Sequence, residues 1–390
     1  MSTQNQNISN LFSNNKNNQQ LTPIQKMNQL KEILFNSSFV TDLQIRMDDN
    51  EKYQRNAFEG FTDEMMIYAF IHKPSHIKDE YNKKENTKKE YIRDLNQFFF
   101  LLYNSRDFFK EDVLNYTEGS LLRNLEKRHI RRYQEWLKNN AKLKNGKIGY
   151  GMATMARKVV IIKSFLKWLF EVEYIEHPLH TAFLNNEIRT KDRPVRDLTY
   201  EQVKALIDYY EYHPFNHAIL TLLATTGLRI DEITKSSWCD LYYDPLQNNY
   251  YLKVIAKGDK ERHTLIKKAV FKRLQKLRIR KRLSSELDPT DQTPIFTTNR
   301  GNAYIASDLS RYVKNVIKQT KFEFLKYKVK DVTPHWFRHY FAQEAHASGA
   351  PLIYIQNTLD HKKSETTEIY LKGIMKKEND AAQYVDENKY

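Results

Sequence analysis

Apolar residues recur at helical spacing through most of the first half of the chain. One set lies four, three and four positions apart, which places its members on one helix face: Tyr91, Leu95, Phe98 and Leu102. Two more helices are predicted by a set of Ile130, Tyr133 and Leu137 and by a set of Val159, Ile162, Phe165, Leu166 and Leu169. This pattern predicts a helical domain over residues 62–184.

The segment before this domain is more polar and less regular. Residues 1–20 are rich in Asn, Gln and Ser, a composition typical of a disordered tail. Pro23 to Phe35 predicts one short amphipathic helix, and an irregular stretch is expected from there to about Thr62. We therefore expect residues 1–61 to form a disordered or irregular N-terminal extension with one short helix.

The second half of the chain begins after a polar stretch. Residues 185–196 are charged and contain Pro194, which predicts an interdomain linker. Thr199 and Gln202 then form a capping box, the signature of a helix start. A second domain is expected over residues 197–390, with a C-terminal tail at residues 371–390.

This second domain contains one clear strand signal. Residues 250–256 and 261–266 flank Gly258-Asp259 and predict a β-hairpin, and residues 294–296 predict a further short strand. Helical patterns surround both. The fold class predicted for the whole chain is mainly α with a small β-sheet.

Charge points to an anionic partner. The chain has 63 Lys and Arg against 48 Asp and Glu, a net charge of +15, for which nucleic acid is the commonest partner and a solvated basic surface the alternative. Basic residues lie beside the apolar faces of two helices and are candidate DNA contacts, although a solvated helix face explains them equally well: Arg128, Arg131, Arg132, Arg157 and Lys158.

Other classes of protein are disfavoured by composition. Cys239 is the only cysteine, which excludes an internal disulfide and any zinc site that needs several cysteines. No window has the roughly 18 apolar residues of a membrane helix, and the N-terminus lacks the apolar core of a signal peptide. We expect a cytoplasmic protein without a membrane partner.

Three short motifs carry candidate chemistry. Arg229 follows an apolar helix and has Glu232 three positions on, which suits either an anion-binding arginine with its support or a simple ion pair. Pro334 suits the first turn of a helix capped by Thr333, which would place His335 and Arg338 at a phosphate-binding N-terminus.

The third motif follows near the C-terminus. His361 and Tyr370 lie nine residues apart across a polar segment. Each motif is weak alone, and with 25 tyrosines in the chain no single tyrosine stands out by its type. The order is more informative: an arginine, a lysine in the hairpin, the His–x–x–Arg pair, a histidine, and a tyrosine.

This ordered set resembles the tyrosine recombinase family, which includes the phage integrases and the Xer and Cre recombinases. The resemblance is strong over residues 198–372 and looser over residues 62–184, where the family has a helical core-DNA-binding domain. By the resemblance, the catalytic residues are Arg229, Lys257, His335, Arg338, His361 and Tyr370, with Glu232 supporting the first arginine. Two features depart from the family pattern: Asp360 stands at a usual glycine, and Lys260 competes with Lys257 for the lysine position.

The resemblance also implies a mechanism and partners. Tyr370 would form a 3′-phosphotyrosine bond with double-stranded DNA, and neither a cofactor nor a metal ion is needed. Two protomers would bind each crossover site and four would form the synapse. An accessory DNA-bending or activator protein stays open as a further partner.

Two alternatives share this chemistry or this fold. A type IB topoisomerase would relax supercoils instead of joining two sites, and a DNA-binding accessory protein would keep the fold without catalysis. The biological role within the family also stays open between integration or excision, the resolution of dimers or cointegrates, and transposition.

Overall fold

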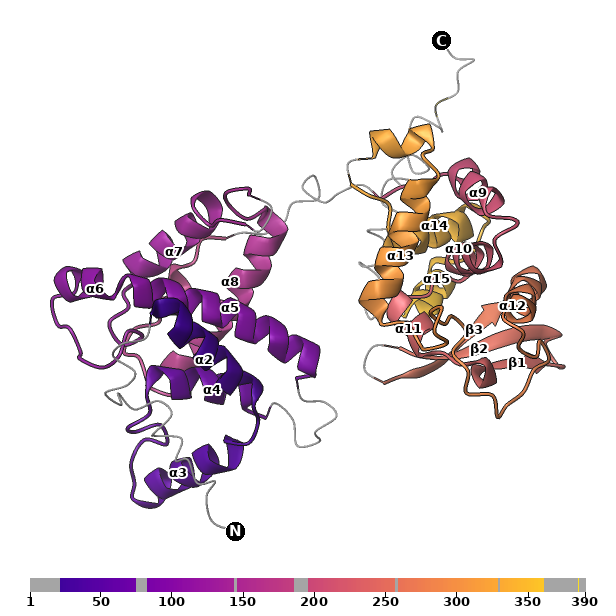
Figure 1. Cartoon of the computed structure of the whole chain (residues 1–390). Helices are drawn as coiled ribbons and strands as arrows, with labels where there is room; N and C mark the ends of the chain where they lie inside the picture. The colour runs from indigo at the N-terminus through magenta and orange to yellow at the C-terminus, as the bar shows by residue number, and fades with distance from the viewer. Residues whose placement is uncertain are drawn as a thin grey trace. The chain divides into compact units, whose positions relative to one another are not determined.

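Two separate hydrophobic cores organise the chain. The computed structural model describes residues 22–74, 83–143, 146–185, 196–256, 259–328, 330–360 and Val385. The chain divides into two units, residues 1–193 and 194–390, and each described part has its own core (Figure 1). The division falls inside the polar stretch at residues 185–196, where the sequence predicts a linker.

The first unit is helical in its described part. Its elements are α2 (Pro23–Phe35), α3 (Val40–Lys52), α4 (Asp63–His72), α5 (Glu85–Asn104), α6 (Arg106–Asp112), α7 (Lys127–Asn139), α8 (Met152–Glu171) and the 3-10 helix η3 (Leu179–Ala182). The predicted apolar faces of α5, α7 and α8 are buried in one core, with Tyr91 at its edge. Helical spacing therefore identified three of the helices that build this unit.

The expected irregular extension before residue 62 is corrected by the structure. Helix α3 occupies part of it, and Met27, Leu34, Leu43 and Phe61 contribute to the core of the first unit. Within α3 only Leu43 is buried, but Val40, Leu43 and Met47 lie at helical spacing, a short periodic signal that the sequence analysis missed. The predicted disordered tail at residues 1–20 lies outside the described residues.

The second unit mixes helices with one sheet. Its helical elements are α9 (Tyr200–Tyr209), α10 (Pro214–Thr226), α11 (Ile230–Lys235), the 3-10 helix η5 (Trp238–Asp240), α12 (Lys268–Arg280), α13 (Ala306–Gln319), the 3-10 helix η6 (Glu323–Tyr327), α14 (Pro334–Ala347) and α15 (Leu352–Leu359). Helix α9 begins at the predicted capping box, because Thr199 accepts a hydrogen bond from the Gln202 amide. The mainly helical fold class with a small sheet is confirmed.

The sheet is antiparallel, in the order β1 (Leu241–Asp244), β2 (Asn249–Ile255), β3 (Glu261–Ile266). The predicted hairpin forms β2 and β3, while β1 was not predicted. Residues 294–296 form no strand; Pro294 makes only an isolated bridge to Ser237. Leu252, Val254 and Ile266 are buried between the sheet and the helices, and α12 packs against β2 (Figure 1).

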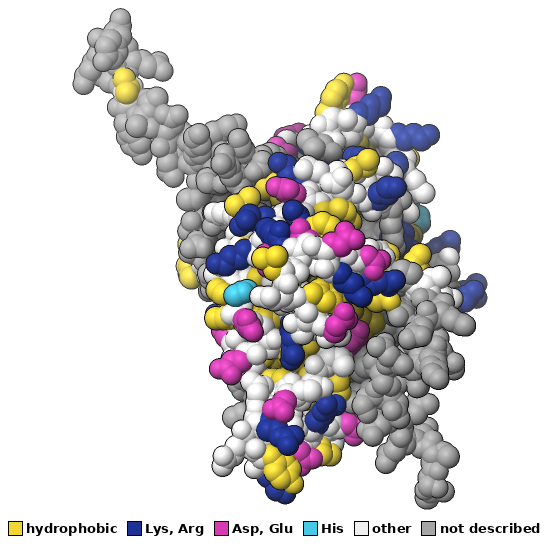
Figure 2. Space-filling model, turned by 90° about the vertical axis from the view of Figure 1, so that its left-hand side faces the viewer, with side chains coloured by type: hydrophobic (Ala, Val, Ile, Leu, Met, Phe, Trp, Pro, Cys, Tyr) yellow, Lys and Arg dark blue, Asp and Glu magenta, His cyan; other side chains and the backbone are white. Residues whose placement is uncertain are grey.

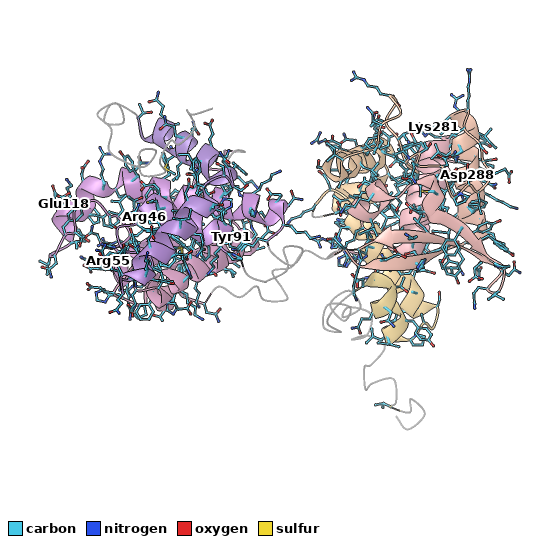
Figure 3. All side chains as sticks on the ribbon, turned by 90° about the horizontal axis from the view of Figure 1, so that it is seen from below. Arg46, Arg55, Tyr91, Glu118, Lys281 and Asp288 are labelled. Atoms are coloured by element: carbon cyan, nitrogen blue, oxygen red, sulfur yellow. The ribbon has the colours of Figure 1, made fainter. Side chains whose placement is uncertain are left out.

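The end of α12 holds the chain that follows it. The Lys281 ammonium donates to the Thr297 carbonyl over 2.9 Å and lies 5.4 Å from the ring centre of Phe215. Figure 3 labels Lys281 and Asp288 in this region of the second unit. Burial lowers the pKa of Lys281. Its contacts with Thr297 and Phe215 give this lysine a structural role.

Helix α10 is the central helix of the second unit. It is apolar on nearly all sides and packs against α9, α12, α13, α14 and β3. It ends at Gly227, which has φ +61° and lies against Phe341 of α14 and Leu359 of α15. Glycine is favoured here both by the left-handed backbone and by the lack of space for a side chain.

Replacing Gly227 by alanine tests this close approach. A Cβ would lie 2.6 Å from Cδ1 of Phe341 and 2.9 Å from Cδ2 of Leu359. We expect Gly227→Ala to lower the free energy of unfolding by about 3 kcal/mol, the sum of left-handed strain and overpacking. Gly301 is the matched control, because it has φ +83° and no atom within 4 Å of a new Cβ. Gly301→Ala should cost about 1 kcal/mol.

Native-state hydrogen exchange of the α10 amides in the full chain measures both losses. Equal losses in the two variants would contradict the crowding at Gly227.

Candidate functional site

Arg229 lies directly after the glycine turn, at the N-cap of α11. Its Nη1 donates to Oε1 of Glu232 over 2.9 Å, and its Nη2 lies 3.3 Å from the carbonyl oxygen of Leu359. The side chain is 33% exposed, so the guanidinium has a face open to solvent. The sequence predicted the pairing with Glu232, and the structure adds the contact with α15.

Glu232 is 1% exposed and binds two arginines. Besides Arg229, it accepts from Nη2 of Arg262 on β3 over 2.8 Å. Arg262 in turn donates from Nη1 to the carbonyl of Thr358 over 2.6 Å. Sequence analysis missed Arg262, although strand alternation places it on the same face as the buried Thr264 and Ile266, where an arginine needs an acidic partner.

Arg338 lies on the second turn of α14. The helix begins at Pro334 after Thr333, as predicted, but the Thr333 side chain makes no capping hydrogen bond. Arg338 is 2% exposed and donates from Nη1 to the carbonyl of Gly227 over 2.7 Å. Its Nη2 donates to the carbonyl of Leu359, the same oxygen that faces Arg229.

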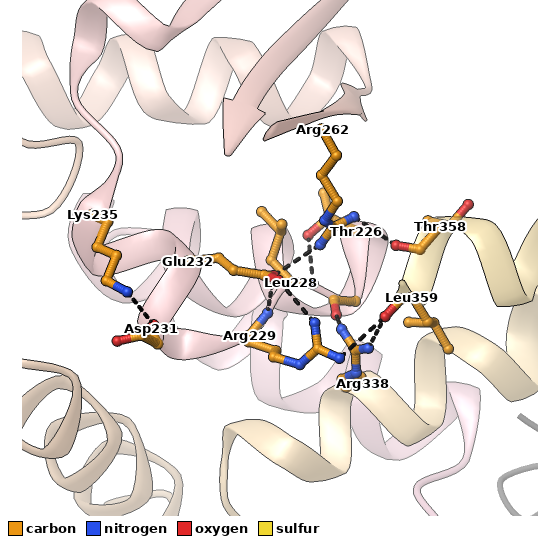
Figure 4. Close-up of polar contacts among 11 residues, drawn as sticks. Thr226, Leu228, Arg229, Asp231, Glu232, Lys235, Arg262, Arg338, Thr358 and Leu359 are labelled. Carbon is orange, nitrogen blue, oxygen red and sulfur yellow. Dashed lines mark hydrogen bonds and ion pairs between the residues drawn. The ribbon is translucent and has the colours of Figure 1, made fainter. Parts of the chain in front are cut away.

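The last carbonyls of α15 thus accept hydrogen bonds from three guanidinium groups. Figure 4 shows Arg229 and Arg338 converging on Leu359, and Arg262 reaching Thr358 and Glu232. Helix C-terminal carbonyls carry partial negative charge, which suits cationic donors. The arrangement brings together Arg229, Glu232 and Arg338, three of the residues selected from the sequence.

The helix ends at Asp360 in the left-handed conformation, with φ 48° and ψ 52°. This geometry explains why the tyrosine recombinase pattern has a glycine at this position. Asp is among the few other residues that tolerate the left-handed region. The departure at Asp360 therefore preserves the turn at some cost in backbone strain.

His335 is exposed on the first turn of α14, with its ring centre 4.8 Å from that of His339. Desolvation by the surrounding protein, followed by the charges of Arg196, Arg338 and Arg229, lowers the pKa of His335 to about 4. The imidazole is therefore neutral at neutral pH and able to accept a proton.

Three predicted catalytic residues, Lys257, His361 and Tyr370, lie outside the described residues. Near Lys257, the described chain resumes at Asp259, and Lys260 is exposed at the end of the hairpin. The Lys260 carbonyl accepts from the Ala256 amide over 2.7 Å. Both lysines therefore belong to the connection between β2 and β3.

The candidate DNA contacts on α7 differ in their availability. Arg131 is exposed, whereas Arg128 pairs with Glu126 at 2.8 Å and with Asp112 at 3.1 Å. Arg132 is 54% exposed and lies 3.7 Å from Asp112. Basic and acidic side chains are interspersed on the face that Figure 2 shows.

Lys158 on α8 has a structural role. It is 4% exposed, and its ammonium donates to Asp94 over 2.7 Å and to Gln97 over 2.6 Å. Neighbouring Arg157 pairs with Glu90 at 3.0 Å. The buried pair could have been recognised in the sequence, because Asp94 and Lys158 each fall on the apolar face of their helix. We leave Lys158 out of the candidate DNA interface.

Comparisons with known proteins identify the family of the chain. The sequence profile of the phage integrase family matches residues 196–376. The tyrosine recombinase XerC of Thermodesulfovibrio yellowstonii is 31% identical over 234 residues, which cover 57% of this chain and 72% of that protein. The XerC of Natranaerobius thermophilus is 28% identical over 301 residues, covering 75% of this chain and 90% of that protein. The chain belongs to the tyrosine recombinase family.

Solved recombinase structures share its fold. The XerH site-specific recombinase, in a post-cleavage complex with a palindromic difH substrate, matches with a TM-score of 0.55 and 17% identity, covering 75% of this chain and 80% of that one. A lambda integrase dimer bound to a COC′ core site matches with a TM-score of 0.51 and 16% identity, covering 74% of this chain and 89% of that one.

As a tyrosine recombinase, the chain is a DNA-breaking and rejoining enzyme for site-specific recombination. The topoisomerase and the silent accessory protein are not favoured. None of the helices in the described residues has the length and apolar run needed to cross a bilayer.

The environment of His335 predicts its titration. The folded-state pKa of about 4 lies below the usual value near 6.5. The ring should therefore stay neutral down to about pH 4 in the chain without DNA. Its contribution to stability is present above pH 6.5 and is lost as the pH falls from there toward 4, because the unfolded chain binds the proton more tightly.

An NMR titration of ring-labelled histidine in the full chain measures this pKa, with His335→Gln identifying the signal. A midpoint at or above 6.5 would contradict the lowering of the His335 pKa by desolvation and by the charges of the three arginines.

Proposed function

We propose that the recombinase cleaves DNA by attack of Tyr370 on a backbone phosphate, which forms a 3′-phosphotyrosine bond and releases a 5′-hydroxyl. The reverse reaction rejoins the strand, so the covalent bond conserves the energy of the phosphodiester. Our observation in support is that Arg229 and Arg338 meet at one oxygen atom, directly before the segment that carries His361 and Tyr370.

The two arginines would bind the non-bridging oxygens of the phosphate. A guanidinium offers planar, paired donors to phosphate, and this interaction strengthens as charge builds in the transition state. Arg229 has an exposed face for this purpose. Arg338 is buried in the chain without DNA, so DNA binding has to open access to one edge of its guanidinium.

Proton transfer would be divided among the other residues. A tyrosine hydroxyl has a pKa near 10, so a neutral imidazole at His335 would assist its deprotonation. Lys257 would protonate the departing 5′-oxygen, with Lys260 as the alternative, and His361 would donate a hydrogen bond to the phosphate. The low pKa of His335 supports its role as an acceptor.

The helical part of the first unit, residues 62–184, would be the core-DNA-binding domain. Arg131 and Arg132 are its best-supported phosphate contacts because both are exposed. Arg128 and Arg157 would have to exchange a carboxylate partner for a phosphate. We propose double-stranded DNA sites as the substrate, bound by a homodimer at each site and joined in a homotetramer.

The biological role stays open between integration or excision, the resolution of dimers or cointegrates, and transposition. Trapping the wild-type chain on random-sequence DNA and sequencing the covalent adducts would provide a target site. A DNA-bending or activator protein would be a partner at that site.

Tyr370→Phe tests the nucleophile. On a suicide duplex that carries the trapped site, wild type should accumulate a covalent protein–DNA adduct, and the variant should form none because phenylalanine has no attacking oxygen. DNA binding should be unchanged in a gel-shift assay. Tyr354→Phe is the control, since Tyr354 is 65% exposed on α15. Persistent adducts in Tyr370→Phe would refute the assignment.

The C-terminal tail is proposed to dock on a neighbouring protomer. Its apolar residues Ile374, Met375, Ala381, Ala382 and Val385 form a loose helical stripe in the sequence. Of these, Val385 is described and is 53% exposed. A single exposed apolar side chain is common on protein surfaces, so support for the docking comes from the stripe in the sequence.

Truncation after Lys372 tests this docking. We expect loss of the tetramer on paired sites, with DNA binding by the single protomer retained, because only the contact between protomers is removed. Light scattering of the DNA complexes measures assembly, and the melting temperature checks that the chain remains folded. Normal tetramers after truncation would mean that the tail packs on its own unit.

A further inference from the structure

We infer that Arg262 is a positioning residue of the recombination site, joining the β2–β3 hairpin to Glu232 and to the end of α15. This inference rests on the proposed function, because it assigns Arg262 a role in presenting Arg229 and the segment after Asp360. Arg262 does not itself touch the phosphate in this role. It acts through the groups that it holds.

The geometry of Arg262 is that of a junction. Its Nη2 donates to Oε2 of Glu232 over 2.8 Å, and its Nη1 donates to the Thr358 carbonyl over 2.6 Å. The three segments involved are far apart in the sequence, by 30 and 96 positions. Figure 4 shows the guanidinium between these partners, on the opposite side of Glu232 from Arg229.

The strand register explains how the arginine reaches this position. Arg262 pairs with Val254 across the hairpin, and Val254 is 1% exposed. Arg262 therefore points to the helical side of the sheet, where its side chain is 15% exposed. Separating so enclosed a guanidinium from its carboxylate partner would leave a buried charge unpaired, which is strongly destabilising.

The effect on Arg229 passes through the carboxylate. Oε2 of Glu232 accepts both from Arg262 and from the Arg229 backbone amide, the latter over 2.7 Å, while Oε1 accepts from the Arg229 guanidinium. With one oxygen held from both sides, the carboxylate cannot rotate, and the direction of the Arg229 guanidinium is fixed. Without Arg262, the carboxylate gains freedom and Arg229 loses its orientation.

The effect on the C-terminal segment passes through the backbone. Thr358 and Leu359 are the last residues of α15, and Asp360 follows in the left-handed turn. Arg262 holds the first of their carbonyls, while Arg229 and Arg338 hold the second. Arg262 thereby fixes the position of the β2–β3 hairpin relative to the end of α15, after which the segment with His361 and Tyr370 begins.

The experiment compares substitutions that separate positioning from folding. Arg262→Met keeps the apolar stem and removes every donor, and Arg262→Lys keeps the charge but not the fork that spans two acceptors. Lys253→Met is the matched control: Lys253 belongs to the same hairpin, is 44% exposed, and pairs with Glu261 at 3.2 Å. The readouts are single-turnover cleavage of the suicide duplex, DNA affinity and melting temperature, all in the full chain.

We expect Arg262→Met to slow cleavage by about tenfold to hundredfold, the usual effect of a small misplacement of catalytic groups. Arg262→Lys should recover part of that rate. DNA affinity should match that of Lys253→Met. A cleavage rate in Arg262→Met equal to that of Lys253→Met would overturn the inference.

A double-mutant cycle with Glu232→Gln distinguishes positioning from general destabilisation. If Arg262 acts through Glu232, the double variant should be about as slow as the slower single variant. Fold losses that simply multiply would show two independent effects and would also overturn the inference. If Arg262→Met lowers the melting temperature, cleavage by Arg262→Met and Arg262→Lys is compared at a temperature where both chains are folded. Partial recovery of the rate in Arg262→Lys would then support the inference, and equal rates in Arg262→Met and Lys253→Met would overturn it.

Tyr370→Phe in the same assay separates this inference from the proposed function. Adducts formed by Tyr370→Phe would remove the proposed nucleophile, whatever Arg262 does. An inactive Tyr370→Phe beside a fully active Arg262→Met would leave the function standing and refute only the role of Arg262.

Discussion

The buried carboxylate of Glu232 is the interaction on which the second unit's site depends. A carboxylate that is 1% exposed is stable only when its charge is compensated, and removing one partner of such a group costs several kcal/mol. Arg229 supplies that compensation from the N-cap of α11, and Arg262 supplies it from β3. The need to neutralise one charge therefore holds together two elements whose contacting residues lie 30 positions apart in the sequence.

The end of α15 extends the same constraint. Its terminal carbonyls accept hydrogen bonds from Arg229, Arg262 and Arg338. These carbonyls are weaker acceptors than a phosphate. Two of their donors, Arg229 and Arg338, are the residues proposed to bind the phosphate. A guanidinium has five N–H donors, so holding this turn does not use all of those on Arg229. Donors can thus be oriented by the protein before DNA arrives, which lowers the cost of ordering them during the reaction.

Basic side chains have different uses within the first unit. In the first unit Lys158 is buried against Asp94, whereas Arg131 is exposed. Both belong to the basic surplus of +15 that indicated an anionic partner. A surplus predicts the kind of partner, but it does not say which cations face it, because each basic side chain can also be neutralised within the protein. Helical phase was misapplied to Lys158, which was expected beside the apolar face of α8 but lies on its buried side.

The sequence by itself determined the helices with strong apolar faces, the hairpin, the order of the candidate catalytic residues and the family. These features depend on local spacing, capping and residue order, which are written along the chain. Helix α3 was not predicted from the sequence, although Val40, Leu43 and Met47 lie at helical spacing in it, and neither was the strand β1. Only the tertiary structure decided that Arg262 meets Glu232 and Thr358, because that contact depends on how a strand and two helices pack.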